Sequence, residues 1–502
     1  MVICFLSQSG VSPMNSTMPY RKYRKLEGVD LFSEKRQDES CTVLEDLWAE
    51  ILTQDESCTV LEDLPDEILT QILSHLNLKE LVRTSVVSSR WRDLWKFTPV
   101  VLEFDGCYTD GANKDRKKFK AWVNHILNLH QAHVDGFIVR FYLDWPAGFM
   151  DKWINRALKK EARNIEINLL PMSNPAHRGY YALPSLQKSL HSYGAKSAFC
   201  FLTSLKLVGV GIHDDTLHYF LASSTSLECL TICGSRFTRS LRIVDPLPKL
   251  KHIEISHCNK MKSVEILVES IVSFTYDGAM INLFFNKTPK NLSALTLAGK
   301  FCQSFFLHAY KHLSYSFQLE RLNLDFPNKH VKRPLRSLAF YKSPYLPQYL
   351  NLKCMEITAS SIVGRNLLFC TKLIEMCPLL YKFRIKTERS IFIPDLSAAE
   401  ASVFHHENLK LFELVGYLGC PSEEEFITLL LKIAPSLMTV TLDTENDFNE
   451  LAWQCHFIEK KFDWVNGSKL PEFAYAKSRI EAKEFAERLQ SKLPQKTQMV
   501  IL

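Results

Sequence analysis

The sequence lacks any apolar run long enough to cross a membrane. No stretch among its 502 residues approaches the ~18 consecutive apolar residues that a spanning helix needs. The opening MVICFL is apolar, but no basic region precedes it and polar residues begin at Ser7, so it is too short for a signal peptide. We therefore expect no membrane partner and a location in the cytosol, the nucleus or both.

A strong excess of charge is also missing. The chain carries 61 basic and 55 acidic side chains, which give a formal net charge of +6. Nucleic-acid binding is typical of proteins with a concentrated basic face, and so small a charge over this length does not indicate one. We expect no nucleic-acid partner.

The cysteines lack the spacing of metal ligands. There are 14 of them, and the closest pair, Cys229 and Cys233, has no second pair nearby. Several others lie in or beside apolar runs, which is typical of buried, reduced thiols. We therefore expect neither a metal site nor a cofactor.

Catalytic motifs are equally sparse. Gly209-Val210-Gly211 lacks the third glycine of a nucleotide-binding loop. His405-His406-Glu407 lacks the i, i+4 histidine spacing of a zinc protease, and no third partner can be named for His257-Cys258. These patterns indicate structural roles, and we expect a protein that is not an enzyme. An ordinary α/β enzyme is the alternative.

What the sequence does contain, from about residue 160, is a recurring L-x-x-L-x-L pattern with aliphatic or aromatic residues at its three places. The middle residues of ten such triplets are Leu205, Leu230, Ile253, Phe274, Leu295, Leu322, Met355, Phe383, Phe412 and Val440. They are separated by 25, 23, 21, 21, 27, 33, 28, 29 and 28 residues. Alternation predicts a short strand with one buried face, and a strand at such intervals is the signature of leucine-rich repeats.

Stacked repeats bury the apolar face that a single unit cannot, so the pattern predicts a curved solenoid with one parallel sheet. Helices or irregular turns are expected between the strands, for example at 213–221 and 423–431. A weaker triplet, Leu335-Leu338-Phe340, leaves the number of repeats between residues 322 and 355 open. After Leu442 the pattern stops, and a charged helix over 476–493 is expected to cap the solenoid.

A 17-residue stretch occurs twice before the repeats. Residues 37–53 read QDESCTVLEDLWAEILT and residues 54–70 read QDESCTVLEDLPDEILT. The copies differ only where Trp48-Ala49 is replaced by Pro65-Asp66. In the first copy nothing interrupts a helix. In the second copy Pro65 would break such a helix, so the helix is expected to start only at the proline.

Only the second copy continues into a helical pattern. Apolar residues at helical spacing follow the proline: Ile68, Leu69, Ile72, Leu73 and Leu76. Asn77 ends this stripe, a second short helix runs from about Lys79, and a third carries Trp91, Leu94 and Trp95 on one face. Three helices in so few residues cannot enclose a sizeable core, so part of their apolar surface must meet another surface.

The residues over 61–105, LEDLPDEILTQILSHLNLKELVRTSVVSSRWRDLWKFTPVVLEFD, resemble the F-box, especially that of plant F-box proteins with leucine-rich repeats. The stretch from His406 to Leu437 is similar to the FBD-type ending of the same proteins. The resemblance covers most of the chain after residue 60, at the level of motifs in the F-box and more loosely in the repeats. It identifies the fold class as α/β, a three-helix F-box followed by a curved leucine-rich-repeat solenoid.

The resemblance implies a non-catalytic substrate receptor of an SCF-type ubiquitin ligase. In that family the F-box binds a Skp-type adaptor, which links it to a cullin and a RING subunit, and the repeats hold a protein target. By the same resemblance, the residues expected to contact the adaptor or to shape that contact are Leu64, Pro65, Ile68, Leu69, Ile72, Leu73, Leu81, Val86 and Trp91. Leu73, Leu76 and Leu94 are equally consistent with internal packing. The alternative function is a repeat scaffold whose F-box does not engage a ligase.

The expected organisation follows from these patterns. It comprises disordered residues 1–36, a duplicated partial F-box start at 37–60, the F-box at 61–105, a linker or first repeat region at 106–160, repeats at 161–445 with the FBD-like end from about 400, and a helical cap at 446–502.

Overall fold

A computed structural model describes the chain from residue 64 onwards, with gaps. The described residues are 64–85, 89–106, 113–141, 149–169, 181–183, 198–244, 247–285, 289–302, 315–326, 348–360, 367–388, 404–417, 419, 421–444, 482–491 and 493–502. The chain divides into two compact units, Met1–His75 and Leu76–Leu502. In the first unit the described part is helix α3 (Asp66–Ser74) with its flanks. The segments 1–36 and 37–60 of the expected organisation lie outside the described residues.

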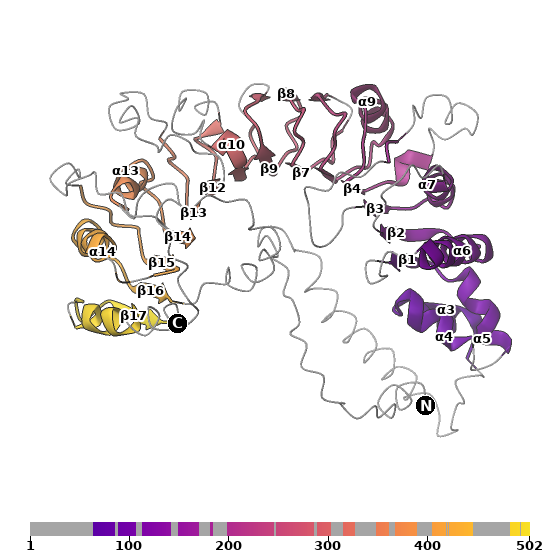
Figure 1. Ribbon diagram of the computed structural model, residues 1–502, viewed down its shortest axis with the longest axis horizontal. Coiled ribbons are helices and arrows are strands. Elements are labelled where there is room, and N and C mark those ends of the chain that lie inside the picture. The colour runs from indigo at the N-terminus through magenta and orange to yellow at the C-terminus, as the bar shows by residue number, and fades with distance from the viewer. Residues whose placement is uncertain are drawn as a thin grey trace, which may run out of the picture. The chain divides into compact units, whose positions relative to one another are not determined.

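The second unit is built on one fourteen-stranded sheet, in which every pair of neighbouring strands is parallel. The sheet is curved (Figure 1). It is open, because its edge strands β1 and β17 are not paired with each other. Its strands, in sheet order, are β1 (Val100–Asp105), β2 (Val134–Arg140), β3 (Asn164–Asn168), β4 (Ser204–Val208), β5 (Cys229–Cys233), β7 (His252–Ser256), β9 (Ser273–Gly278), β11 (Ala294–Ala298), β12 (Arg321–Phe326), β13 (Cys354–Ser360), β14 (Lys382–Glu388), β15 (Leu411–Val415), β16 (Thr439–Asp443) and β17 (Gln498–Ile501).

The middle and last residues of all ten L-x-x-L-x-L triplets lie on strands of this sheet, and the first residue of each triplet precedes its strand. The middle residue of each pairs in register with the middle residue of the next, from Leu205 on β4 to Val440 on β16. All ten middle residues are buried. The residues on either side of each middle residue alternate toward the other face, as the pleat requires. The predicted repeat rhythm is confirmed.

The buried face of the sheet is covered by an outer layer that changes along the chain. Helices α6 (Asn113–Leu129), α7 (Phe149–Lys159) and α9 (Asp214–Ser223) cover its first part (Figure 1). Helices α13 (Phe369–Glu375) and α14 (Pro421–Ile433) cover its last part (Figure 1). The helices expected around 213–221 and 423–431 are α9 and α14.

In the middle repeats, a second parallel sheet takes the place of helices. It consists of β6 (Ser240–Ile243), β8 (Ser263–Ile266) and β10 (Asn282–Phe285), in the order β10-β8-β6. These are the repeats with the shortest spacing, 23, 21 and 21 residues. A strand advances about 3.3 Å per residue and a helix about 1.5 Å, so a short repeat spans its outer side with fewer residues as a strand.

Aromatic rings join the sheet to both kinds of outer layer. Phe274 on β9 meets Phe285 on β10 edge to face, with ring centroids 5.7 Å apart. Phe412 on β15 meets Phe426 on α14 in the same way, also at 5.7 Å. One continuous core therefore runs between the sheet and its covering layer.

The sheet begins before the expected boundary at residue 161. Strands β1 and β2 extend the same ladder, since Leu102 pairs with Phe137, Phe137 with Ile165 and Ile165 with Leu205. Part of the expected F-box, 100–105, and part of the expected linker are thus repeat strands. The steps from Leu102 to Phe137 and from Ile165 to Leu205 are longer than any step between the ten triplets, which hides them from a search by interval.

The pattern also continues past Leu442, contrary to expectation. The C-terminal part is helical over residues 482–490 and then forms β17, which pairs with β16 through Val440↔Met499 and Leu442↔Ile501. The first place of this triplet is Lys496 instead of an apolar residue, so the pattern fails there. The expected helical cap therefore includes a further strand of the sheet.

The additional triplet at Leu335 to Phe340 lies outside the described residues. The strands on either side of it in the sequence, β12 and β13, pair directly with each other. Within the described part of the chain, none of the helices has the length and apolar character needed to traverse a membrane.

Candidate functional site

Helix α3 begins immediately after Pro65. The proline has φ −55° and ψ 151°, and its carbonyl accepts the amide of Leu69 at 3.1 Å, which closes the first turn. Asp66 and Glu67 lie in that turn, where the helix dipole favours acidic side chains. The start predicted from the proline is confirmed to within one residue.

The apolar side chains of α3 differ sharply in burial. Leu69 and Leu73 are 0 % exposed. Ile68 and Ile72 are half-buried, as is Leu64 just before the helix, and Pro65 is exposed. Of the expected adaptor-contacting residues in this unit, the structure therefore leaves four accessible to a partner: Leu64, Pro65, Ile68 and Ile72.

Helix α4 (Leu78–Thr84) starts with a capping box. The side chain of Asn77 accepts the amide of Glu80 at 3.1 Å, and the Glu80 carboxylate accepts the amide of Asn77 at 3.1 Å. Sequence reasoning identified Asn77 only as the residue that ends the preceding stripe, although N-x-x-E before an apolar run is itself a helix-start signal. Leu81 is fully buried on this helix.

Replacing Asn77 with alanine should destabilise α4 by about 1 kcal/mol, the usual cost of losing an N-cap side chain. Amide hydrogen exchange at Glu80 and Leu81 would measure the loss as several-fold faster exchange. Lys79→Ala, at an exposed position of the same helix, is the control and should leave exchange unchanged. Equal exchange in the two variants would show that the capping box does not hold this helix.

Helix α5 (Ser89–Leu94) carries the expected aromatic face. Trp91 is 1 % exposed, Leu94 8 % and Trp95, at the start of the following 3-10 helix (Trp95–Phe97), 3 %. Leu81 and Trp91 are therefore buried within the second unit, and neither presents its side chain to a partner. Val86, the remaining expected contact residue, lies outside the described residues.

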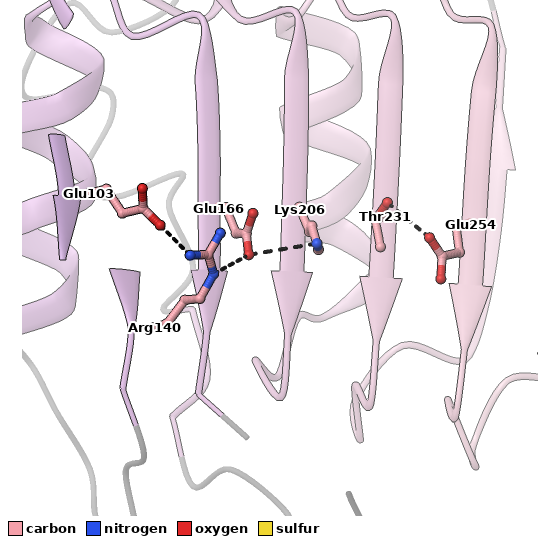
Figure 2. Close-up of polar contacts among 6 residues, drawn as sticks. All are labelled: Glu103, Arg140, Glu166, Lys206, Thr231 and Glu254. Carbon is pink, nitrogen blue, oxygen red and sulfur yellow. Dashed lines mark hydrogen bonds and ion pairs between the residues drawn. The ribbon is translucent and has the colours of Figure 1, made fainter. Parts of the chain in front are cut away.

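The polar face of the large sheet carries charged side chains at the places between the apolar residues of the strands. Arg140 on β2 pairs with Glu103 on β1 and, at 3.1 Å, with Glu166 on β3. Lys206 on β4 reaches the same Glu166 oxygen at 3.6 Å, so that the contacts form a line across the strands (Figure 2). Sequence reasoning found no charge theme here. Glu103, Glu166 and Lys206 lie between the last two apolar residues of their strands, whereas Arg140 follows the last apolar residue of β2.

A second cluster lies on the same face at β13 to β15. Arg384 pairs with Glu413 at 3.0 Å and with Glu356 at 3.7 Å. Lys386 also pairs with Glu356, at 2.9 Å, and Lys382 with Glu413, at 3.3 Å. Each carboxylate in this cluster has two cationic partners. Half-exposed ion pairs contribute little stability, about 0–1 kcal/mol each, so their main effect is on the charge pattern that a partner meets.

Family models match both the N-terminal helices and the repeats of this chain. The family model for the F-box domain matches residues 61–100. The model described as the At1g61320/AtMIF1 LRR domain matches residues 148–470, more than half of the chain. The chain belongs to the plant F-box/leucine-rich-repeat family.

The sequence identity to individual members of this family is low. The F-box/FBD/LRR-repeat protein At5g53840 of Arabidopsis thaliana is 32 % identical over 37 % of this chain and 42 % of its own length. The F-box/LRR-repeat protein 13 of the same organism is 23 % identical over 47 % of this chain and 51 % of its own. The putative FBD-associated F-box protein At1g05080 is 24 % identical over 74 % and 87 %. This chain thus spans about half the length of the first two relatives.

In this F-box/leucine-rich-repeat protein, the enzyme-like patterns serve the fold. Gly209 has φ +71° in the turn after β4, and its amide bonds to Cys233 O at 2.8 Å in the next repeat. His406 is buried, accepts the amide of Leu409 at Nδ1 and places Nε2 2.8 Å from Cys377 O, which assigns the proton to Nε2. Among the described residues, no group of three His, Cys, Asp or Glu side chains is arranged to hold a metal ion.

Proposed function

We propose that this protein is the substrate-recognition subunit of an SCF-type ubiquitin ligase. Its F-box would bind a Skp-type adaptor, and through it the cullin and RING subunits, while its repeats would bind a protein target. Family membership supports the coarser statement, that the chain is a protein-interaction adaptor. The chain itself would contribute no catalytic group.

The observation that carries the proposal is the apolar surface at the start of α3. Leu64, Pro65, Ile68 and Ile72 stay accessible although α3 also has a buried apolar side at Leu69 and Leu73. A helix that packed only through its buried side would carry polar residues at the accessible positions, so the apolar residues found there favour a second contact surface. Covering a large apolar side chain on binding contributes about 1.5–3 kcal/mol, so a few of them are enough to anchor a complex.

Affinity capture of the full-length chain with a purified Skp-type adaptor tests the proposal. The wild type should retain the adaptor, and addition of cullin should give a larger complex. The double variant Leu64→Ala/Pro65→Ala should lose most of the adaptor. Failure of the wild type to bind, or equal binding by the double variant, would favour the repeat scaffold whose F-box does not engage a ligase.

The duplicated segment gives an independent prediction. The F-box match begins at residue 61, and only the second copy has the proline that starts α3. Deleting residues 37–53 should therefore leave adaptor affinity within about twofold of the wild type, measured by calorimetric titration. The matched deletion of 54–70 joins the first copy directly to Gln71, so its product differs from that of the first deletion only in carrying Trp48-Ala49 in place of Pro65-Asp66. It should bind the adaptor more weakly, because the proline at the start of the helix is lost. A large loss on deleting 37–53 would show that the first copy takes part in the contact.

The remaining partner and location statements stay predictions. They are the absence of membrane and nucleic-acid partners and a location in the cytosol, the nucleus or both.

A further inference from the structure

Glu254 occupies the centre of the polar face, in the middle of β7. In register with it are Thr231 on β5 and Thr275 on β9, and Thr296 on β11 follows in the same row. Its contact with Thr231, whose hydroxyl donates to the Glu254 carboxylate, measures 3.5 Å, at the limit of a hydrogen bond (Figure 2). Glu254 is thus a carboxylate set in a row of threonines.

Glu254 differs from the other carboxylates of this row. Glu103 and Glu166 pair with Arg140, and Glu356 and Glu413 share Arg384 with Lys386 and Lys382. Among the residues that the structure describes, no cation lies within ion-pair distance of Glu254. Its side chain is half-buried, and burial raises its pKa because the charged form is desolvated.

The surroundings of Glu254 are acidic. The polar-face positions of β1 to β9 hold five carboxylates against two permanent cations, namely Glu103, Asp105, Glu166, Glu254 and Asp277 against Arg140 and Lys206. The nearby His257, in the turn after β7, approaches Asp277 at 3.5 Å. A hydrogen bond to Cys233 and the charges of Asp277 and Glu254 raise the pKa of His257 to about 8. Among the described residues Glu254 makes no ion pair, although the nearby charges of Lys206 and His257 act on it and partly offset the effect of burial on its pKa.

We propose that the polar face of strands β1 to β9 binds an extended, basic segment of the target protein, with Glu254 accepting a lysine or arginine side chain. This inference rests on the proposed function and names the chemistry of the partner that the repeats recognise. Charge complementarity supports this inference, because a cation placed over Glu254, between Thr231 and Thr275 of the same row, would supply the ion-pair partner that Glu254 lacks. The flanking hydroxyls can accept the further N–H groups that an ammonium or guanidinium carries.

A random-peptide display library selected on the immobilised full-length chain tests this inference. Peptides retained by the wild type should contain a several-fold excess of lysine and arginine over the unselected library. Glu254→Gln keeps the shape of the side chain and removes its charge, and should abolish that excess. Glu265→Gln is the matched control, because Glu265 lies on β8 of the second sheet and pairs with Arg242 at 2.9 Å. It should retain the wild-type selection.

A retained peptide, measured by fluorescence anisotropy, should bind Glu254→Gln about tenfold more weakly than the wild type, and the difference should shrink at high salt. Capture of no peptide, of peptides without a basic excess, or equal affinity for the two chains would overturn the inference. Thermal unfolding of each variant verifies that it is folded.

Adaptor capture with the same samples separates this inference from the proposed function. Glu254→Gln should bind the Skp-type adaptor as the wild type does. A chain that selects basic peptides but fails to bind the adaptor would refute the ligase function and leave the basic-segment inference standing. A chain that binds the adaptor but selects no basic peptides would refute the basic-segment inference and leave the ligase function standing.

Discussion

Replacing both Ile68 and Ile72 with aspartate should weaken binding of the Skp-type adaptor by about 100-fold or more. Each isoleucine is half-buried in the free chain, so covering the rest of it contributes about half of the 1.5–3 kcal/mol of a full burial, and 1.4 kcal/mol corresponds to a factor of ten. A carboxylate at either place would also have to be desolvated without a partner, which adds to the loss. Calorimetric titration of the full-length variant with the adaptor measures the effect.

The control for this experiment is Gln71→Asp. Gln71 is exposed on the same helix, between the two isoleucines in sequence, and the substitution introduces the same side chain. The control therefore reproduces the effect of one aspartate on helix propensity, and this variant should bind within a few-fold of the wild type. Full adaptor affinity in the Ile68/Ile72 variant would place the adaptor contact elsewhere on the chain.

Truncating Phe274 to alanine should lower the free energy of unfolding by about 3–5 kcal/mol, the range for a large aromatic residue removed from a packed core. Phe274 is 0 % exposed and lies in the middle of the sheet, between Ile253 and Leu295 in the ladder. Its ring also packs against Phe285 of the second sheet. Because a solenoid is held together by contacts between neighbouring repeats, a cavity here weakens the junction of its two halves.

Phe284→Ala is the matched control. Phe284 lies next to Phe285 on β10 but is 56 % exposed, so the same truncation removes little buried surface. Urea unfolding followed by tryptophan fluorescence and by circular dichroism should show a large shift for Phe274→Ala and a small one for Phe284→Ala. Equal shifts would mean that the paired strands, and not the aromatic core, determine stability in this region.

The repeat strands were predictable because their side chains alternate and recur at similar intervals. The residues that the sequence places at the three positions of each triplet are buried and in register, from Leu202 to Leu442. Alternation reports burial on one face of a strand, and that property depends on the strand and its neighbours alone. The second sheet was not predictable in the same way, because β6, β8 and β10 are too short for the alternation to be distinctive.

The polar bonds between repeats were missed for a different reason. Leucine-rich repeats commonly carry an Asn or Cys three residues after the last apolar place, and Cys258 alone matches. Its buried thiol contacts Ile232 O of the preceding repeat at 3.8 Å. Elsewhere the amide side chains come from the residue just before the first apolar place. Asn351 donates to Phe317 O at 2.7 Å, and Asn408 to Pro378 O at 2.9 Å. The bonding is preserved although its position in the repeat has changed.

The candidate adaptor surface was predicted only in part. The resemblance identifies the residues of the motif, but a motif records both the side chains that contact a partner and those that hold the helices together. Burial separates the two groups, since Leu69, Leu73 and Trp91 are inside and Ile68 and Ile72 are accessible. The ion pairs of the repeat face were beyond sequence reasoning because they join strands that are far apart in the chain.

Strand β17 has a consequence for how the protein behaves at high concentration. Its four residues cover the edge of β16. The backbone amide of Gln498 donates to Met438 O at 2.8 Å, and the backbone amide of Leu502 donates to Leu442 O at 2.9 Å. Without it, β16 would present a row of unpaired amides and carbonyls, which is a template for joining another chain edge to edge. A short edge strand offers such a template over only a few residues. The same four residues therefore oppose self-association into fibrous aggregates, and loss of the C-terminal strand should be seen first as precipitation.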